Sequence, residues 1–174
     1  YYGDRGDTTV TETTPPGGDC LARLCVDWER EAEQASPTTR VVVLRSGLVL
    51  HPSGGALARM LLPFRLGVGG RIGSGAQYLS WIHVEDWVSF VLWVLNTAAA
   101  RGAFNATAPA PVTNAQYTKA LGHALRRPTV IPVPAFGLRL AFGEIAETLL
   151  TGQRAGPMRA QEMGFAFRFP LIEE

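Results

Sequence analysis

The run Val41-Val42-Val43-Leu44 constrains the fold more than any other part of this 174-residue chain. Its apolar side chains follow one another without a polar residue between them, which is typical of a strand covered on both faces in a parallel sheet. We therefore expect a buried strand within residues 40–50. Parallel strands need long, usually helical, connections, so the same run favours an α/β fold.

Helical spacing of apolar residues predicts five helices. The first follows Asp19, a residue suited to cap a helix, and the third starts near Val84 with the clearest amphipathic pattern. Thr113 and Gln116 have the spacing of a capping box at the start of the fourth. The predicted ranges are 20–35, 56–66, 84–95, 113–126 and 135–150.

The remaining segments are predicted to be extended or irregular. Residues 77–84, 104–106 and 130–133 are strand candidates, and a weak alternation over 165–169 predicts a last edge strand. Residues 8–18 carry threonines, two prolines and paired glycines, so we expect a loop there.

Composition excludes several classes of function. The 16 basic and 15 acidic residues leave a net charge of +1, so there is no basic excess to neutralise the phosphates of a nucleic acid. No apolar run approaches the roughly 20 residues of a membrane span. His51, His83 and His123 are scattered and have no cysteine at ligand spacing, so no metal site is expected.

The two cysteines indicate a reducing compartment. Cys20 and Cys25 lie five residues apart on the first predicted helix, where their side chains point to different faces and cannot easily bridge. Any targeting segment would precede residue 1. The localisation therefore stays open between a cytosol-like compartment and an organelle such as a chloroplast or mitochondrion.

Three segments resemble one superfamily. Residues 78–87, YLSWIHVEDW, resemble the aromatic-[IV]-His-Val-x-Asp signature of extended short-chain dehydrogenases/reductases, which include the sugar-nucleotide epimerases. Residues 102–105, GAFN, resemble the Gly-x-[FY]-Asn strand that follows it there, and residues 1–3, YYG, resemble the segment after the catalytic serine strand. Further segments resemble an atypical branch of it, the epimerase-family proteins labelled as cell-division-inhibitor or giant-chloroplast type: LAxLCxxWE at 21–29, RxGxVL at 45–50, GGA at 54–56, GSGxQ at 73–77 and GQR at 152–154.

The resemblance implies a Rossmann domain that binds NADP(H), with a small carboxy-terminal lobe for substrate. On this basis residues 1–174 are expected to be a single partial domain, the carboxy-terminal portion of such a protein. Residues 1–18 would be a loop after a strand, residues 19–50 a helix and strand of the Rossmann side, and residues 51–174 mainly the substrate-type lobe with returning strands.

Two sets of binding residues follow from the same resemblance. Arg45, Ser46, Gly47 and Val49 stand at the carboxyl edge of the predicted buried strand, where such sheets bind ligands, so they are candidate contacts of the nicotinamide side. An ordinary strand exit is the alternative. The second set could hold an anionic substrate tail, or could be a solvated hairpin; it comprises Arg65, Arg71, Gly73, Ser74 and Gln77.

The catalytic residues of the superfamily are not matched. Its tyrosine and lysine, one helical turn apart, align with Leu21 and Cys25, and neither side chain can replace the proton donor or the ammonium charge. Tyr2 and His83 are the remaining candidates, although a histidine at a strand-to-helix junction more often has a structural role. A glycine-rich turn for the cofactor phosphates is also missing, so NADP(H) is implied by the family alone and no cofactor is expected on this fragment by itself.

Two functions remain open. The first is a degenerate epimerase-like fold that acts as a binding or structural module, as a subunit of a larger assembly. The alternative is an NADP(H)-dependent oxidoreductase or sugar-nucleotide epimerase whose cofactor half lies outside these residues. Both imply a partner surface, either for another protein or for the missing half, because a half sheet leaves an unpaired edge.

Overall fold

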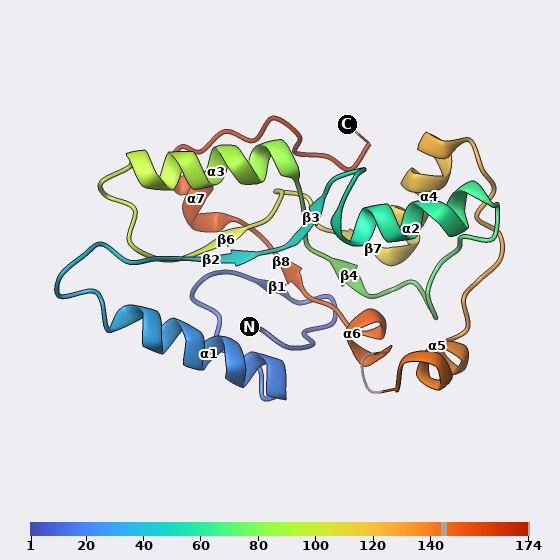
Figure 1. The fold of residues 1–174 in the computed structure, drawn as a ribbon, viewed down its shortest axis with the longest axis horizontal. Helices are drawn as coiled ribbons and strands as arrows, with labels where there is room; N and C mark the ends of the chain where they lie inside the picture. The colour runs from blue at the N-terminus through green and yellow to red at the C-terminus, as the bar shows by residue number, and fades with distance from the viewer. Residues whose placement is uncertain (144–145, 174) are drawn as a thin grey trace.

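A parallel strand pair between two helices forms the centre of the fold. The computed structural model describes residues 1–143 and 146–173. Strand β2 (Val42–Ser46) pairs in parallel with β6 (Gly102–Ala106). Helix α3 (Val84–Asn96) lies on one side of this pair and α1 (Cys20–Glu33) on the other (Figure 1). The α/β class and the parallel sheet predicted from the sequence are confirmed.

The predicted strand over residues 40–50 is two strands that exchange partners at Gly47. Strand β3 (Leu48–Leu50) pairs in parallel with β5 (Trp81–His83), whereas β2 pairs with β6. A Cβ atom on Gly47 would lie 2.5 Å from the carbonyl oxygen of Ser80, so only glycine lets the two backbones approach there. The Leu48 amide donates to that same oxygen over 2.7 Å.

Two further strand pairs are short, and one of them joins segments near the two ends of the chain. Strand β4 (Tyr78–Leu79) runs antiparallel to β7 (Val112–Thr113). Strand β1 (Thr9–Val10) pairs in parallel with β8 (Arg154–Ala155), although 145 residues separate the first register partners, Thr9 and Arg154. The prediction of a loop over residues 8–18 was therefore wrong for β1, because two residues are too few to carry a strand signal.

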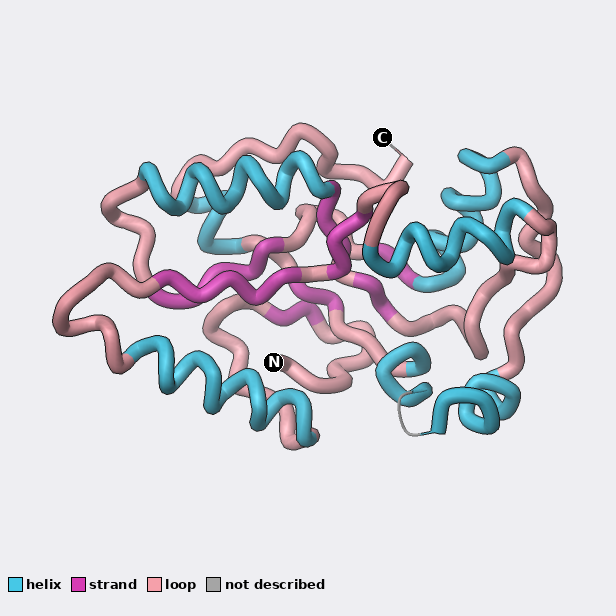
Figure 2. Tube along the Cα trace, viewed as in Figure 1, coloured by secondary structure: helices cyan, strands magenta, loops and turns pink. Residues whose placement is uncertain are grey.

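The helices follow the apolar spacing closely. Besides α1 and α3, the structure has α2 (Gly55–Arg65) and α4 (Asn114–Leu125), and the capping box of Thr113 and Gln116 is formed. The helix predicted over 135–150 is described as α5 (Ala135–Phe142) and α6 (Ala146–Leu150), while positions 144 and 145 lie outside the described residues. Helix α7 (Met158–Glu162) was not predicted. Figure 2 shows α2, α4, α5 and α6 gathered at one end of the molecule.

Two strand predictions were wrong. Residues 130–133 contribute only an isolated bridge between Val133 and Ile72. Residues 165–169 form no strand, because the amides of Arg168 and Phe169 donate to the buried carboxylate of Asp86, each over 2.9 Å. The alternation in this segment instead directs Phe165 and Phe167 into a cluster of rings around Phe90.

Three apolar clusters form the core of the part that the structure describes. The largest joins α3, β6 and α7 around Phe90 and Phe104, both fully buried. A second lies around Trp81 and Tyr117 between β5 and α4, and a third joins Tyr2 to β1 and β8. In the described part of the chain, no helix is both long enough and apolar enough to cross a membrane.

Candidate functional site

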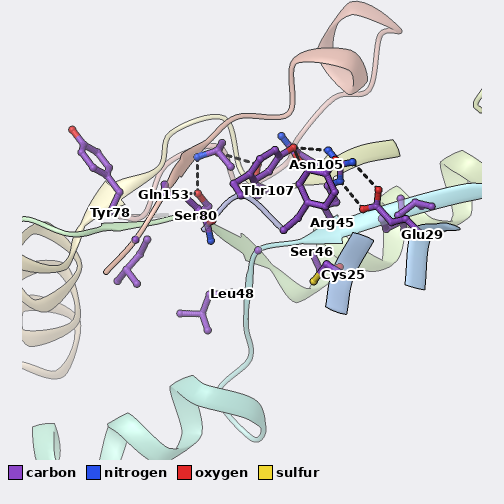
Figure 3. A pocket seen from close by; sticks show the side chains of 18 of the residues that line it. Cys25, Glu29, Arg45, Ser46, Leu48, Tyr78, Ser80, Asn105, Thr107 and Gln153 are labelled. Atoms are coloured by element: carbon purple, nitrogen blue, oxygen red, sulfur yellow. Dashed lines mark hydrogen bonds and ion pairs between the residues drawn. The ribbon is translucent and has the colours of Figure 1, made fainter. Parts of the chain in front are cut away.

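A pocket of about 730 Å³ lies beside β2, with α1 as one wall and the turn before β8 as another. Arg45, Ser46 and Gly47 line it from the carboxyl end of β2, and Cys25 and Glu29 line it from α1 (Figure 3). Within the described residues β2 pairs only with β6, so its second edge is unpaired. The pocket therefore combines a strand end with open backbone groups, and both can bind a ligand.

Arg45 organises one side of the pocket. Its guanidinium donates to both carboxylate oxygens of Glu29 over 2.8 Å each, and to the Tyr2 hydroxyl over 3.0 Å. The group also lies 3.4 Å above the centroid of the Tyr1 ring. Burial lowers the pKa of Arg45, but hydrogen bonds with Glu29 and Tyr2 outweigh this effect and raise the pKa above its usual range. This guanidinium stays charged, and its charge is neutralised by Glu29.

Tyr2 is buried, and its hydroxyl both donates and accepts a hydrogen bond in this network. Its hydroxyl donates to the side-chain oxygen of Asn105 over 2.6 Å. Burial raises the pKa of Tyr2, more than the neighbouring Arg45 lowers it. The phenol is therefore neutral at physiological pH and is held as a hydrogen-bond donor, not primed as a base. Arg45 supplies the cation beside Tyr2, whereas Arg5 binds the carbonyl oxygens of Tyr2, Pro15 and Pro16.

The opposite side is built on a close approach of backbones around Ser80. The Ser80 hydroxyl donates to the carbonyl of Gln153 and accepts from the amide of Ala155, over 2.8 Å each. A Cβ atom on Gly152 would lie 2.2 Å from the Tyr78 carbonyl oxygen, so this position also requires glycine. These contacts fix Gln153 at the pocket wall, as Figure 3 shows.

The predicted catalytic positions are spread apart. Tyr2 and Cys25 line the pocket, whereas Leu21 does not and is 56% exposed on α1. His83 is the N-cap of α3, where its Nδ1 accepts from the Glu85 amide, and its ring packs 4.0 Å from that of Phe169. The structure thus brings together the positions of Tyr2 and Cys25 but gives His83 helix-capping contacts.

The predicted nicotinamide-side set lies largely in one place. Arg45, Ser46 and Gly47 line the pocket, and Leu48 does so in place of Val49. The Ser46 hydroxyl accepts from the indole of Trp87, on α3, over 3.0 Å.

The predicted anion-binding set lies outside this pocket. Arg65 and Arg71 are exposed, at the end of α2 and in the loop after it. Gly73 and Ser74 belong to that loop, which is tied to the rest of the lobe at several points. The Gln77 amide nitrogen donates to the carbonyls of Ile72 and Leu149, so it fixes the loop instead of facing the pocket. Among the described residues, no acidic, histidine or cysteine side chains form a group that could hold a metal.

Sequence reasoning missed several residues that build the site. The Glu12 carboxylate accepts from the backbone N–H of Asn105 through one oxygen, while its second oxygen has no partner among the described residues. Ser80, Asn105, Thr107 and Gln153 reach the pocket from three separate segments, so no local pattern groups them. The glycine before Gln153 is the one sequence signal at that position, because it marks a close backbone approach.

Comparison with known proteins gives a consistent set of relatives. A family model described as a domain of unknown function (DUF1731) matches residues 133–174. An epimerase family protein of Mycobacterium tuberculosis is 47% identical over 100% of this chain and 58% of its own length. Epimerase family protein SDR39U1 of mouse is 46% identical over 99% of this chain and 59% of its own length. The chain thus spans less than two thirds of the length of these curated relatives.

Solved structures agree with these relatives. Human epimerase family protein SDR39U1, crystallised with NADPH, has a TM-score of 0.93 and 39% identity, over 99% of this chain and 59% of that one. A nucleoside-diphosphate sugar epimerase of Corynebacterium glutamicum has a TM-score of 0.77 and 34% identity, over 98% of this chain and 33% of that one. A UDP-glucose 4-epimerase of Thermus thermophilus, 14% identical with a TM-score of 0.69, shares the fold.

Proposed function

We propose that this chain is part of an NADP(H)-binding protein, in which it forms the substrate lobe and the wall beside the reactive ring of the cofactor. Its relatives support an atypical short-chain dehydrogenase/reductase of the epimerase family. The pocket at the carboxyl end of β2 carries the proposal. Open α/β sheets bind their ligands at this edge, and the pocket has a strand end, an unpaired strand edge and a helix as its walls.

The residues present fit one end of the cofactor. Arg45 and the backbone from Ser46 to Leu48 line the place where its reactive ring would lie, and a dinucleotide would supply hydride chemistry there when bound. The phosphate end is not matched in the described residues. Gly54 and Gly55 lead from β3 into α2, but the spaced glycines of a dinucleotide-binding turn are absent. We propose that the phosphates are held by polypeptide outside these 174 residues, as the greater length of the relatives allows.

The proposed function does not include the usual proton relay of the superfamily. Leu21 stands exposed where the tyrosine would be, and the Cys25 thiol stands at the lysine position. Tyr2 remains a neutral phenol that donates to Asn105. Ligand binding at the pocket is therefore proposed ahead of epimerisation, which needs a group that exchanges protons.

Filling the pocket tests this proposal. Phenylalanine in place of Cys25 would fill the space beside β2, while Cys20→Phe places the same ring on an exposed position of the same helix. Trp28 also lines the pocket, so its fluorescence reports occupancy. In the longer polypeptide that also carries the proposed phosphate-binding part, we expect saturable quenching by NADPH in the wild type and in Cys20→Phe, with at least tenfold weaker binding in Cys25→Phe. Equal NADPH binding by both variants, or no quenching in the wild type, would refute the proposal.

A second candidate, a binding or structural module, is favoured by the surface of α1. Leu21, Leu24 and Trp28 are 56%, 43% and 67% exposed on this helix, next to the open edge of β2. An apolar helix face beside an unpaired strand is typical of a surface that packs against another polypeptide. We propose that the polypeptide carrying the cofactor phosphates occupies this surface, so the two candidates share one partner.

A further inference from the structure

A second cavity, of about 610 Å³, lies at the carboxyl end of α4. No described residue lines both this cavity and the pocket beside β2, and α1 and α4 lie towards opposite ends of the molecule (Figure 1). Among the described residues that line the second cavity, none is acidic and four are basic: Lys119, His123, Arg126 and Arg127. We call it the basic cavity. Its charge is a local feature, because the whole chain has a net charge of only +1.

The four basic side chains have no partner in the part of the chain that the structure describes. None of them makes a hydrogen bond, an ion pair or a contact with an aromatic ring there. Other arginines are held by the fold: Arg40 donates to three backbone carbonyls, and Arg45 donates to both carboxylate oxygens of Glu29. The donors of the basic cavity are exposed and therefore remain available to a ligand.

A tight turn brings these side chains together. The Arg126 amide donates to the His123 carbonyl over 3.0 Å, and α4 ends there. The Arg127 amide donates to the Gly122 carbonyl over 2.9 Å. A Cβ atom on Gly122 would lie 2.4 Å from Cγ2 of Thr129, so the chain can fold back here only because this residue is glycine. The carboxyl end of a helix favours cations, but these two carbonyls already have backbone donors and do not occupy the basic side chains.

Arg126 has a backbone conformation that favours glycine. Its φ of 53° and ψ of 43° are left-handed, and no other residue except glycine has a positive φ in the described part of the chain. Glycine is the usual residue where a helix ends in this conformation, because a Cβ atom is strained there. The arginine is therefore less stable here than glycine would be, and no hydrogen bond of its side chain offsets the strain within these residues. A ligand that binds the guanidinium would explain why an arginine stands at this position.

We propose that the basic cavity binds a small molecule that carries phosphate groups. Phosphate oxygens accept hydrogen bonds from several directions, and a guanidinium fork can bind two of them at once. The basic lining is confined to one cavity of a nearly neutral chain, which favours a small anion over a long polyanion such as a nucleic acid. The cavity is separate from the pocket beside β2, so this site is an addition to the proposed function.

Titration of the longer polypeptide with pyrophosphate tests this proposal. Binding is followed by NMR at the backbone amides of Gly122 and Thr129, which both line the basic cavity. The readout is local because the part that holds the cofactor phosphates would also bind pyrophosphate. We expect saturable shifts of both amides that weaken as the salt concentration rises. Citrate, whose charge is spread over three separate carboxylates, should bind at least fivefold more weakly.

The variant Arg126→Gly distinguishes a ligand-binding role from a structural one. Glycine suits the left-handed backbone, so this variant should unfold at a higher urea concentration than the wild type. Its affinity for pyrophosphate should nevertheless fall at least fivefold, because one guanidinium is lost. Arg30→Gln removes the same charge from an exposed position of α1 and should change the affinity less than twofold.

Three outcomes would overturn the proposal: no shift of the two amides with pyrophosphate, equal affinity of Arg126→Gly and the wild type, or citrate binding as tight as that of pyrophosphate. These outcomes are distinct from a failure of the proposed function. Cys25→Phe, which fills the pocket beside β2, should leave the pyrophosphate shifts of Gly122 and Thr129 unchanged.

Discussion

Some buried polar side chains in this molecule have hydrogen-bond partners for their polar atoms, and others do not. Arg45 and Glu29 pair through two hydrogen bonds, and Tyr2 joins them to Asn105. Tyr117, by contrast, is 2% exposed, and its hydroxyl has no partner among the described residues. The hydrogen bonds of Arg45, Glu29 and Tyr2 hold the pocket wall in place. The unpaired hydroxyl of Tyr117 only lowers the free energy of unfolding.

Replacing Tyr117 should therefore stabilise the protein, and more so at high pH. Burial raises the pKa of Tyr117 to about 12 from 10.0, so the folded state binds a proton that the unfolded state has lost between these values. The free energy of unfolding is therefore unaffected by this hydroxyl's titration below pH 10. It falls as the pH rises towards 12, by about 2–3 kcal/mol at roughly 1.4 kcal/mol per pKa unit.

The measurement is urea unfolding of wild type and Tyr117→Phe at pH 8 and pH 11. We expect the variant to gain about 1 kcal/mol at pH 8 by losing an unsatisfied hydroxyl, and to gain more at pH 11. Tyr78→Phe, at a half-buried position, is the control and should change neither value appreciably. A variant that is less stable than the wild type at both pH values would contradict this account.

At the scale of elements, helices were predictable and short strands were not. The ranges of α1, α3 and α4 follow from capping residues and apolar spacing, both of which are local. Strands β1 and β8 have two residues each and find one another across the whole chain, which no local pattern encodes. The candidate site divides in the same way: Arg45 to Gly47 follow a recognisable strand, but Ser80 and Gln153 reach the pocket only through tertiary contacts.

The segment 165–169 shows how one side chain overrides a local pattern. Its alternation suits a strand, yet two of its amides bind the Asp86 carboxylate at the start of α3. Asp86 also lies in the first turn of the helix, where a negative charge is favourable. The helix start and the segment after α7 are thus joined by one residue.

Removing that carboxylate should release the segment. For Asp86→Ala we expect a loss of about 2–4 kcal/mol in the free energy of unfolding, because two partly buried amides lose a charged acceptor. Hydrogen exchange at the amides of Arg168 and Phe169 should accelerate at least tenfold. Glu85→Ala, which removes an exposed ion pair with Arg168, is the control and should leave these amides protected. Unchanged exchange in Asp86→Ala would show that ring packing alone holds the segment.

At the scale of the whole molecule, one surface combines an unpaired strand edge with exposed apolar side chains. The open edge of β2 and the apolar residues Leu21 and Leu24 of α1 lie together, while the other face of the β2–β6 pair is covered by α3 (Figure 1). The buried strand expected over residues 40–50 is accordingly only half-buried in its β2 part. Its sequence is apolar enough for two covered faces; α3 covers one, and on the side of α1 the pocket leaves β2 partly uncovered.

We therefore expect the 174-residue chain to self-associate when it is purified without a partner. Static light scattering should give a mass above that of the 18.8 kDa monomer. Leu24→Glu should shift the chain towards the monomer, whereas Leu140→Glu, at the 87% exposed Leu140 of α5, should not. A wild-type chain that stays monomeric at high concentration would refute this expectation.

The change of strand partner at Gly47 also limits how this protein can evolve. Side chains alternate between the two faces of a strand, so an insertion or deletion at this point would turn every side chain of β3 over, and Leu50 would leave the core. Gly47 alone links β2 to β3, so there is no loop that could accommodate an inserted or deleted residue. Evolution here is therefore restricted to exchanging one amino acid for another, and the spacing from Arg45 to Leu50 should be constant even where the residues themselves diverge.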